Sequence, residues 1–366
     1  MKWSQPLNLF AIAKQINLEN GKRASFITCP FFFCTLNYCM ATIIKSNSVN
    51  GKPLKLSRTL SLRDFYHKRQ KILILRSCGG LGDILMHRMI FEDLKNTVPD
   101  AEIHFACPWM YHDVVKDHPF IDKIIDSETV DITEYIITYN TSTACGRYEL
   151  ALAPYSGEHR SDIWADHCGV VLKNHNMHIK LTEKEKKNGK KLIEENRDRN
   201  GPSVAFCPIS AWRGKNLLRH QILGVTNHLH KQGCYVFGLH NDPIMTFVEN
   251  DVPFIHDIKS RTWMSVISQA DYIISVDTAG FHCAGGMGKP LLGIFTWADG
   301  DIYGKYYDCL IAQRHRNHDP SWTCGPCYDW SNCPKVQRNI VKPCLTELSP
   351  ELIIEQVEKM FKRWPK

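Results

Sequence analysis

Short runs of apolar residues recur along the chain after residue 70, separated by stretches in which apolar positions follow helical spacing. The runs that predict buried parallel strands are 71–75, 102–106, 149–153, 203–207, 234–238, 272–276 and 291–296. The helical patterns cover 83–97, 160–173, 218–232 and 261–269. Short apolar strands that alternate with helices predict an α/β fold with doubly wound parallel sheets.

A highly charged segment, 181–202, divides this pattern in two. It predicts an exposed helix and then a linker that ends in Asn-Gly-Pro, a combination that favours a loop. A second series of strands and helices begins at Ser203. The sequence therefore predicts one α/β domain at 70–180 and another at 203–348, with a ligand cleft between them.

The two ends of the chain differ from these domains. Residues 1–69 form an unassigned extension, and its stretch 26–44 is uncharged but contains a proline, an asparagine and threonines that weaken the case for a membrane span. Met40 offers an alternative start of the chain. Residues 349–366 begin with Ser-Pro and predict an amphipathic helix, which either packs back on the first domain or lies on the surface.

Composition narrows the possible partners. Apolar residues make up 43% of the chain and charged residues 23%, as in ordinary globular proteins. A net charge of +7 favours anionic ligands such as nucleotides, phosphates or an acidic lipid surface, but no region is basic enough for a nucleic-acid-binding arm. The 15 cysteines, without a secretion signal before them, indicate buried thiols in a reducing cytosol. We therefore expect a cytoplasmic protein, with peripheral membrane association as the alternative.

The stretch SCGGLGDILM follows the first predicted strand and opens the first predicted helix. Its glycines, Gly79, Gly80 and Gly82, do not form G-x-G-x-x-G, which disfavours a nicotinamide-dependent oxidoreductase. A helix start stabilises negative charge, so Asp83 is expected to stay ionised and to repel a phosphate at this position. The glycines would let a substrate approach, and Asp83 then suits a general base that takes a proton from a hydroxyl. The alternative is that Asp83 merely caps the helix.

Two loops of the second domain are suited to phosphates. Hydroxyl and free N–H groups at the start of a helix bind phosphate well, and ligands gather at the carboxyl ends of parallel strands. The residues at such positions are Ser210, Arg213, Lys215, Thr278, Ala279 and Gly280. Arg213 and Lys215 could also form a solvated basic turn without a ligand.

Three motifs together resemble the heptosyltransferases of glycosyltransferase family nine, which have the GT-B fold of two Rossmann-like domains facing a central cleft. They are the opening strand with GDILM, the loop CPISAWRGK, and SVDTAGFHCAGGMGKPLLGIF at 275–295. The resemblance covers roughly residues 70–360. It implies inverting transfer of a heptose or other hexose-like sugar from a nucleotide-diphosphate sugar to a hydroxyl, without a catalytic metal. The resemblance does not fix the acceptor. The positive charge and the apolar N-terminal region fit a saccharide or a lipid-linked saccharide such as lipopolysaccharide, and a protein hydroxyl is the alternative.

The resemblance also assigns roles to individual residues. Asp83 corresponds to the catalytic carboxylate that activates the acceptor hydroxyl. Ser210 and Lys215 match positions that contact the donor diphosphate, and Lys215 would stabilise charge on the leaving group. The donor-binding loop corresponds to Asp277, Thr278, Ala279, Gly280 and His282.

This sequence departs from the family pattern at two points. Ala279 stands where a glycine commonly follows the threonine, and after 234–238 only Asp242 could hold the ribose of the nucleotide. The base of the donor is therefore open. His282 has a structural alternative, a buried helical histidine bonded to a carbonyl.

A cysteine cluster lies within 323–345. Cys324, Cys327, Cys333 and Cys344 have good spacing for a tetrathiolate site, for which zinc is the default. Iron is the alternative, because some members of the family that the chain resembles carry an iron-bound finger. A metal closed by four thiolates would have a structural role. The remaining alternatives are free thiols, or a ligand from His315 or His318.

Basic and aromatic residues interleave in 303–342, among them Tyr303, Tyr307 and Trp322. They support a second hypothesis, a catalytically inactive transferase-like scaffold that binds nucleotide or nucleic acid through this region. Such aromatics more often pack around a small metal loop, so we consider nucleic acid unlikely. The presence of both Asp83 and Lys215 favours catalysis.

Overall fold

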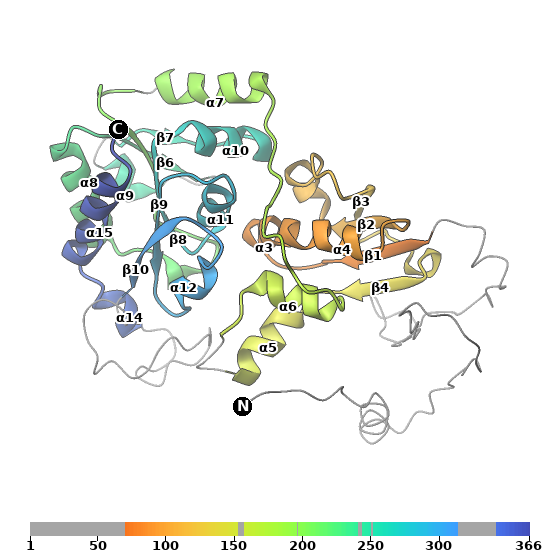
Figure 1. Cartoon of the computed structure of the whole chain (residues 1–366). Helices are drawn as coiled ribbons and strands as arrows, with labels where there is room; N and C mark the ends of the chain where they lie inside the picture. Colours follow the sequence, from red (N-terminus) through yellow and green to blue (C-terminus); the bar gives the residue numbers. More distant parts are fainter. Residues whose placement is uncertain (1–69, 153–156, 196, 241–243, 250–251, 314–341) are drawn as a thin grey trace, which may run out of the picture. The chain divides into compact units, whose positions relative to one another are not determined.

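The computed structural model describes residues 70–152, 157–195, 197–240, 244–249, 252–313 and 342–366, all within one compact unit (Figure 1). They form two parallel β-sheets with helices between and around the strands. The α/β fold with two parallel sheets that the apolar runs predict is therefore confirmed. In the described part of the chain, no helix combines the length and the apolar composition needed to cross a bilayer. The apolar stretch 26–44 lies outside the described residues.

The first half contains a parallel sheet in the order β3-β2-β1-β4. Its strands are β1 (Lys71–Leu75), β2 (Glu102–Cys107), β3 (Lys123–Asp126) and β4 (Ile137–Asn140). Its helical segments are α3 (Leu81–His87), η1 (Arg88–Ile90), α4 (Phe91–Thr97), η2 (Trp109–Val114), η3 (Ile132–Glu134), α5 (Ala144–Leu152) and α6 (Arg160–His167). Ile72 and Ile74 of β1 join the main core, whereas Leu73 packs in a small cluster with Ala106. Burial on both faces explains why β1 is continuously apolar.

The second half contains a longer parallel sheet in the order β10-β9-β8-β5-β6-β7. Its strands are β5 (Ser203–Cys207), β6 (Tyr235–Leu239), β7 (Phe254–Ile255), β8 (Tyr272–Val276), β9 (Leu291–Phe295) and β10 (Cys309–Gln313). Its helical segments are η4 (Arg213–Lys215), α8 (Arg219–Lys231), α9 (Met245–Val248), α10 (Ser260–Gln269), α11 (Ala279–Gly286), α12 (Gly300–Tyr303), α14 (Pro343–Thr346) and α15 (Pro350–Arg363). Every residue of β5, β8 and β9 is buried, as expected of central strands between two layers.

One predicted strand, 149–153, is wrong. Residues up to Leu152 belong to helix α5, and the strand beside β1 is β4 instead. A five-residue apolar run fits a strand and a buried helix turn equally well, so its length did not decide between them. The sequence also did not predict β3 or β4, because their residues are only partly buried and carry no continuous apolar run.

The charged segment after the first half is a helix, α7 (Glu183–Glu195), but it is not exposed on all sides. It packs along α10, with Gly189 and Ile193 buried. A Cβ atom on Gly189 would lie 2.4 Å from Ser265 Oγ, so only glycine permits this approach. The many lysines and glutamates of α7 concealed this contact, because its buried stripe is so narrow.

The terminal helix α15 packs on the second half rather than on the first. Ile353, Val357 and Met360 belong to the core cluster of β5, β8 and β9, and α15 also lies along α8. The Tyr272 hydroxyl donates a hydrogen bond to the Trp364 carbonyl just after the helix. The apolar stripe of α15 thus packs on the sheet of the second half and is not available to the first half.

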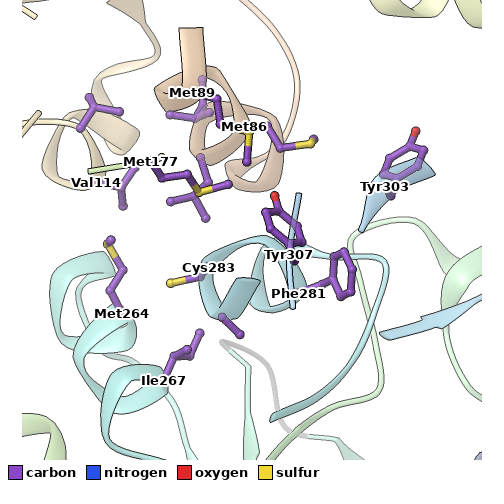
Figure 2. Close-up of a cluster of buried hydrophobic side chains, with 14 of the residues drawn as sticks. Met86, Met89, Val114, Met177, Met264, Ile267, Phe281, Cys283, Tyr303 and Tyr307 are labelled. Atoms are coloured by element: carbon purple, nitrogen blue, oxygen red, sulfur yellow. The ribbon is translucent and has the colours of Figure 1, made fainter. Parts of the chain in front are cut away.

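The two halves share one apolar cluster, part of which Figure 2 shows. Met89 from the first half, Met177 from the connecting segment and Cys283 of α11 all lie in it and are buried. A Cβ atom on Gly286 would lie 2.2 Å from Met177 Sδ, so α11 approaches the connecting segment closely. Flexible methionines suit such an irregular contact between two domains.

Arg88 holds the connecting segment of this cluster in place. Its guanidinium has no solvent exposure and donates to the carbonyls of Met177 (2.6 Å), Val114 (2.6 Å) and His178 (2.7 Å). It also pairs with Asp117 at 3.1 Å. Arg88 thus ties the segment that leaves the first half to the interior of that half.

Replacing this guanidinium should destabilise the protein strongly. We expect Arg88→Met to lower the free energy of unfolding by about 3–5 kcal/mol, because three carbonyls lose their donor and Asp117 keeps only Arg261 and the Lys180 N–H. Arg199→Met is the control, since the Arg199 side chain is 40% exposed, and should change it by less than about 0.5 kcal/mol. Urea unfolding at neutral pH measures both, and equal effects would contradict the role given to Arg88.

Candidate functional site

The glycine-rich loop at 79–82 joins the carboxyl end of β1 to helix α3. Gly79 has φ +106°, a conformation that favours glycine, and a Cβ atom there would lie 2.4 Å from Arg76 Nη2 and 2.7 Å from Asp83 Oδ2. Gly80 is exposed with open space beside its Cβ position, and its N–H donates to Asp83 Oδ2 at 3.1 Å. Asp83 therefore caps α3, as one alternative from the sequence had it, and lies beside an open backbone turn.

Two arginines hold the Asp83 carboxylate. Arg160 donates to Oδ1 at 2.8 Å, and Arg76 Nη2 lies 3.3 Å from Oδ2. The Asp83 side chain is 14% exposed. Burial alone would raise the pKa of this carboxyl, but Arg160, Arg76 and the Gly80 N–H together lower it to about 2. Asp83 is thus ionised at any physiological pH.

Each arginine is itself fixed in place. Arg76 donates to the carbonyls of Thr141 (2.8 Å) and Ser142 (3.0 Å). Arg160 makes a bidentate pair with Glu149, with Nε 2.7 Å from Oε1 and Nη2 2.9 Å from Oε2. Glu149 is 2% exposed, so this is a buried, charge-assisted pair with fixed geometry.

The second half places a matching set of residues at the end of β8. Asp277 pairs with Lys215 at 2.7 Å, and His282 Nε2 lies 3.8 Å from the other Asp277 oxygen. His282 Nδ1 is hydrogen-bonded to the Tyr307 hydroxyl at 3.1 Å, and His282 is 2% exposed. Burial would raise the pKa of Asp277, but Lys215 and His282 hold it well below its usual range. Lys215 and His282 are therefore pre-organised around the buried Asp277 carboxylate.

Helix α11 begins directly after this carboxylate. Thr278 is its N-cap residue and has extended backbone, but its side chain makes no capping hydrogen bond. A Cβ atom on Gly280 would lie 3.1 Å from both Cys207 Sγ and Ser275 Oγ, so the helix lies tight against the sheet. This leaves the Thr278 hydroxyl and the first N–H groups of α11 suited to an anion.

The starts of α3 and α11 meet. A Cβ atom on Gly82 would lie 3.0 Å from His282 Cδ2 and 3.6 Å from the Ala279 backbone. The two helices have extensive contact, so the loop with Asp83 and the loop with Thr278 border one region. A side chain at position 82 would require His282 to shift, so glycine favours this close approach of the two halves.

The structure places the remaining predicted residues less centrally. The Ser210 hydroxyl donates to the Trp212 carbonyl at 2.9 Å and its N–H to Asn216 Oδ1 at 2.7 Å, so Ser210 shapes its own loop. Arg213 is exposed at the start of η4. Lys215 is 20% exposed and reaches Asp277. Of the three, Lys215 has the geometry of a site residue in the described structure.

Sequence reasoning missed Arg76, Arg160 and Glu149. Arg76 directly follows the strand run KILIL, so a cation before a glycine-rich loop was a local signal. Arg160 and Glu149 lie on α6 and α5 and reach Asp83 only through the fold, so the sequence held no signal for them.

Most of the cysteine cluster lies outside the described residues. Cys324, Cys327 and Cys333 lie outside the described residues, whereas Cys344 is buried in α14. Within the described ranges, no group of three or more His, Cys, Asp or Glu side chains could hold a metal ion. The basic, aromatic region 303–342 is likewise mostly outside them, but its Tyr303 and Tyr307 are buried and so do not form a stacking surface for bases.

Comparisons with known proteins place the fold. No protein-family model and no curated protein sequence matches the chain. A family 9 glycosyl transferase from Veillonella parvula is similar in structure, with TM-score 0.62 and 13% identity over 80% of this chain and 97% of its own. ADP-heptose lipopolysaccharide heptosyltransferase II of E. coli gives TM-score 0.58 and 13% identity, over 80% of this chain and 99% of its own.

A third similar structure is the dodecameric iron-containing heptosyltransferase TibC of enterotoxigenic E. coli, solved in complex with ADP-D-β-D-heptose. It gives TM-score 0.59 and 13% identity, over 86% of this chain and 79% of its own. At this identity the likeness establishes a common fold. The resemblance to family-nine heptosyltransferases is thereby confirmed at the level of the fold.

Three buried histidines predict an unusual response to acid. Burial lowers the pKa of His87 to about 3, of His159 to about 3 and of His118 to about 2. The unfolded chain takes up these protons near pH 6.5 and the folded chain does not, so folding loses stability as the pH falls below about 6.5. The lowered carboxyl pKa values of Asp83 and Asp277 change the free energy of unfolding only below about pH 4.

We therefore expect the free energy of unfolding to drop by up to about 4 kcal/mol for each pH unit between about pH 6 and pH 5. Urea unfolding over this range measures the slope. His118→Gln should reduce the slope by about 1.4 kcal/mol per pH unit, because one proton uptake is removed. A free energy of unfolding that stays constant from pH 7 to pH 5 would show that these imidazoles are not held neutral.

Proposed function

We propose that the chain is an inverting glycosyltransferase that moves a sugar from a nucleotide-diphosphate sugar to an acceptor hydroxyl. The observation that carries this proposal is the contact between Gly82 and the start of α11, with a Cβ position 3.0 Å from His282. At this contact the loop with the ionised Asp83 of one half borders the start of α11 from the other half, where Lys215 pairs with Asp277. That pairing suits a reaction with a nucleophile to deprotonate and a diphosphate to release.

The donor would bind on the second half. Lys215, the Thr278 hydroxyl and the N–H groups of Ala279 and Gly280 would hold the diphosphate, and Asp277 would keep Lys215 oriented. Arg213, exposed at the loop edge, and Ser210, which shapes the loop, would act at the periphery of this site. TibC bound to ADP-D-β-D-heptose supports an ADP-sugar as the first donor to test.

The acceptor would bind over the exposed turn at Gly79 and Gly80, where there is open space beside Gly80. Its hydroxyl oxygen forms a bond to the anomeric carbon while the bond from that carbon to the diphosphate oxygen breaks. The hydroxyl proton passes to Asp83, and the nucleoside diphosphate leaves with its negative charge held by Lys215. Because the pKa of Asp83 is about 2, it accepts the proton late, once the attacking oxygen carries positive charge.

Turnover assays test this proposal. Wild-type protein should release nucleotide from ADP-, GDP- or UDP-sugars in the presence of a panel of saccharide acceptors. Asp83→Asn should lower kcat by about 100- to 10,000-fold, because the proton acceptor is lost. Asp166→Asn, an exposed aspartate on α6, is the matched control and should keep wild-type turnover.

Binding assays separate the two loops. Lys215→Met should weaken nucleotide-diphosphate binding in a thermal-shift assay, whereas Asp83→Asn should leave it within about twofold. Equal turnover by wild type and Asp83→Asn would contradict Asp83 as the base. No turnover by wild type with any donor would count against the transferase itself and favour a binding protein.

We also propose that Cys324, Cys327, Cys333 and Cys344 hold a structural metal. Four thiolates suit either zinc, which is the default, or iron. The iron-containing TibC supports iron. Elemental analysis of purified protein should find about one metal ion per chain. Cys327→Ser should lose it and lower the Tm, whereas Cys78→Ser, an exposed thiol of the glycine-rich loop, should keep it. Metal-free wild-type protein with an unchanged Tm would refute the site.

A further inference from the structure

We propose that Tyr303, from the second half, is a positioning residue for the Asp83 carboxylate of the first half and acts through Glu149 and Arg160. The inference rests on the proposed function and extends it: the half that binds the donor also sets the geometry of the base. It is carried by an unbroken set of contacts between Asp83 and Tyr303.

The first link fixes Asp83. Arg160 Nη1 donates to Asp83 Oδ1 at 2.8 Å, while its Nε and Nη2 are both committed to Glu149. The guanidinium is planar and rigid, so the orientation of Glu149 determines where Nη1 points. Arg160 therefore orients one oxygen of the Asp83 carboxylate, while Arg76 and the Gly80 N–H hold the other.

The second link crosses from one half to the other. The Tyr303 hydroxyl donates to Glu149 Oε1 at 3.2 Å, and the Arg160 guanidinium lies 5.2 Å from the centre of the Tyr303 ring. Glu149 is 2% exposed and Tyr303 3% exposed, so water does not compete for these contacts. Tyr303 therefore contacts both members of the ion pair that holds Asp83.

A neighbouring contact provides an internal comparison. The Tyr306 hydroxyl donates to Asp162 at 2.6 Å, again from the second half to helix α6 of the first. Asp162 also pairs with Lys305 at 3.1 Å, and its described partners do not include Arg160, Glu149 or Asp83. Both tyrosines thus tie the halves together, but only Tyr303 touches residues that orient the base.

The contacts of Tyr303 relate the orientation of Asp83 to the contact between the two halves. Tyr303 can hold Glu149 and Arg160 only while the second half is in contact with the first. If the halves separated, the Glu149–Arg160 pair would lose its contacts with Tyr303. Asp83 would then be correctly oriented only while the donor-binding half is in place. This would couple base orientation to donor binding without any contact between Tyr303 and the substrates.

Steady-state kinetics test this coupling. Tyr303→Phe keeps the ring and removes one hydrogen bond to Glu149, so kcat should fall about fivefold with the donor KM unchanged. Glu149→Gln removes the anchor of Arg160, and kcat should fall about 10- to 100-fold. In an Asp83→Asn background, neither change should lower kcat further, because both act through Asp83. Tyr306→Phe should leave kcat within about twofold in either background, as expected of a contact that only joins the halves.

Two results would overturn the inference: Tyr303→Phe behaving like Tyr306→Phe, or its effect persisting undiminished without the Asp83 carboxylate. If wild type turns over no donor, the proposed function fails, and a thermal double-mutant cycle then decides the positioning role. Tm losses of Asp83→Asn and Tyr303→Phe should be non-additive, and those of Asp83→Asn and Tyr306→Phe additive. Additive losses for both pairs would refute the link from Tyr303 to Asp83.

Discussion

A buried carboxylate between two arginines organises the structure around it. Asp83 is stable there only because Arg160 and Arg76 offset the cost of burying its charge, since an unpaired buried carboxylate would take up a proton. This requirement explains Gly79, whose missing side chain admits both Arg76 and Asp83. It also explains why Glu149 is buried far from solvent: Arg160 needs a second anion to be held rigidly.

The second half repeats this arrangement with different residues. Asp277 is buried and neutralised by Lys215, as Asp83 is by its arginines. In both loops the charges are paired before any ligand is present. A ligand therefore binds by replacing one of the existing partners, because it finds no unpaired charge there. A diphosphate would draw Lys215 toward itself, whereas a neutral hydroxyl would need only a free lone pair on Asp83. The two loops therefore favour chemically different ligands, which agrees with the separate donor and acceptor sites that we propose.

The fold of this chain depends little on overall sequence similarity. A fold can be shared at 13% identity because many apolar sequences satisfy the same burial pattern. Fold alone does not determine substrate. In the function that we propose, the substrate would depend on a few side chains at the two loops, which meet where Gly82 contacts the start of α11.

The sequence alone determined the α/β architecture and the positions of both loops. Continuous apolar runs follow from burial on two faces of a sheet, and glycine-rich turns after such runs mark where chemistry is placed, so both are local signals. It failed at 149–153, where a short apolar run fits a helix as well as a strand. Only the tertiary structure decided what surrounds Asp83. Arg160 lies 77 positions from Asp83, and Tyr303 lies 154 positions from Glu149, so no spacing in the chain relates them. Long-range ion pairs depend on how α5, α6 and α12 pack, and packing is a property of the whole fold rather than of any segment.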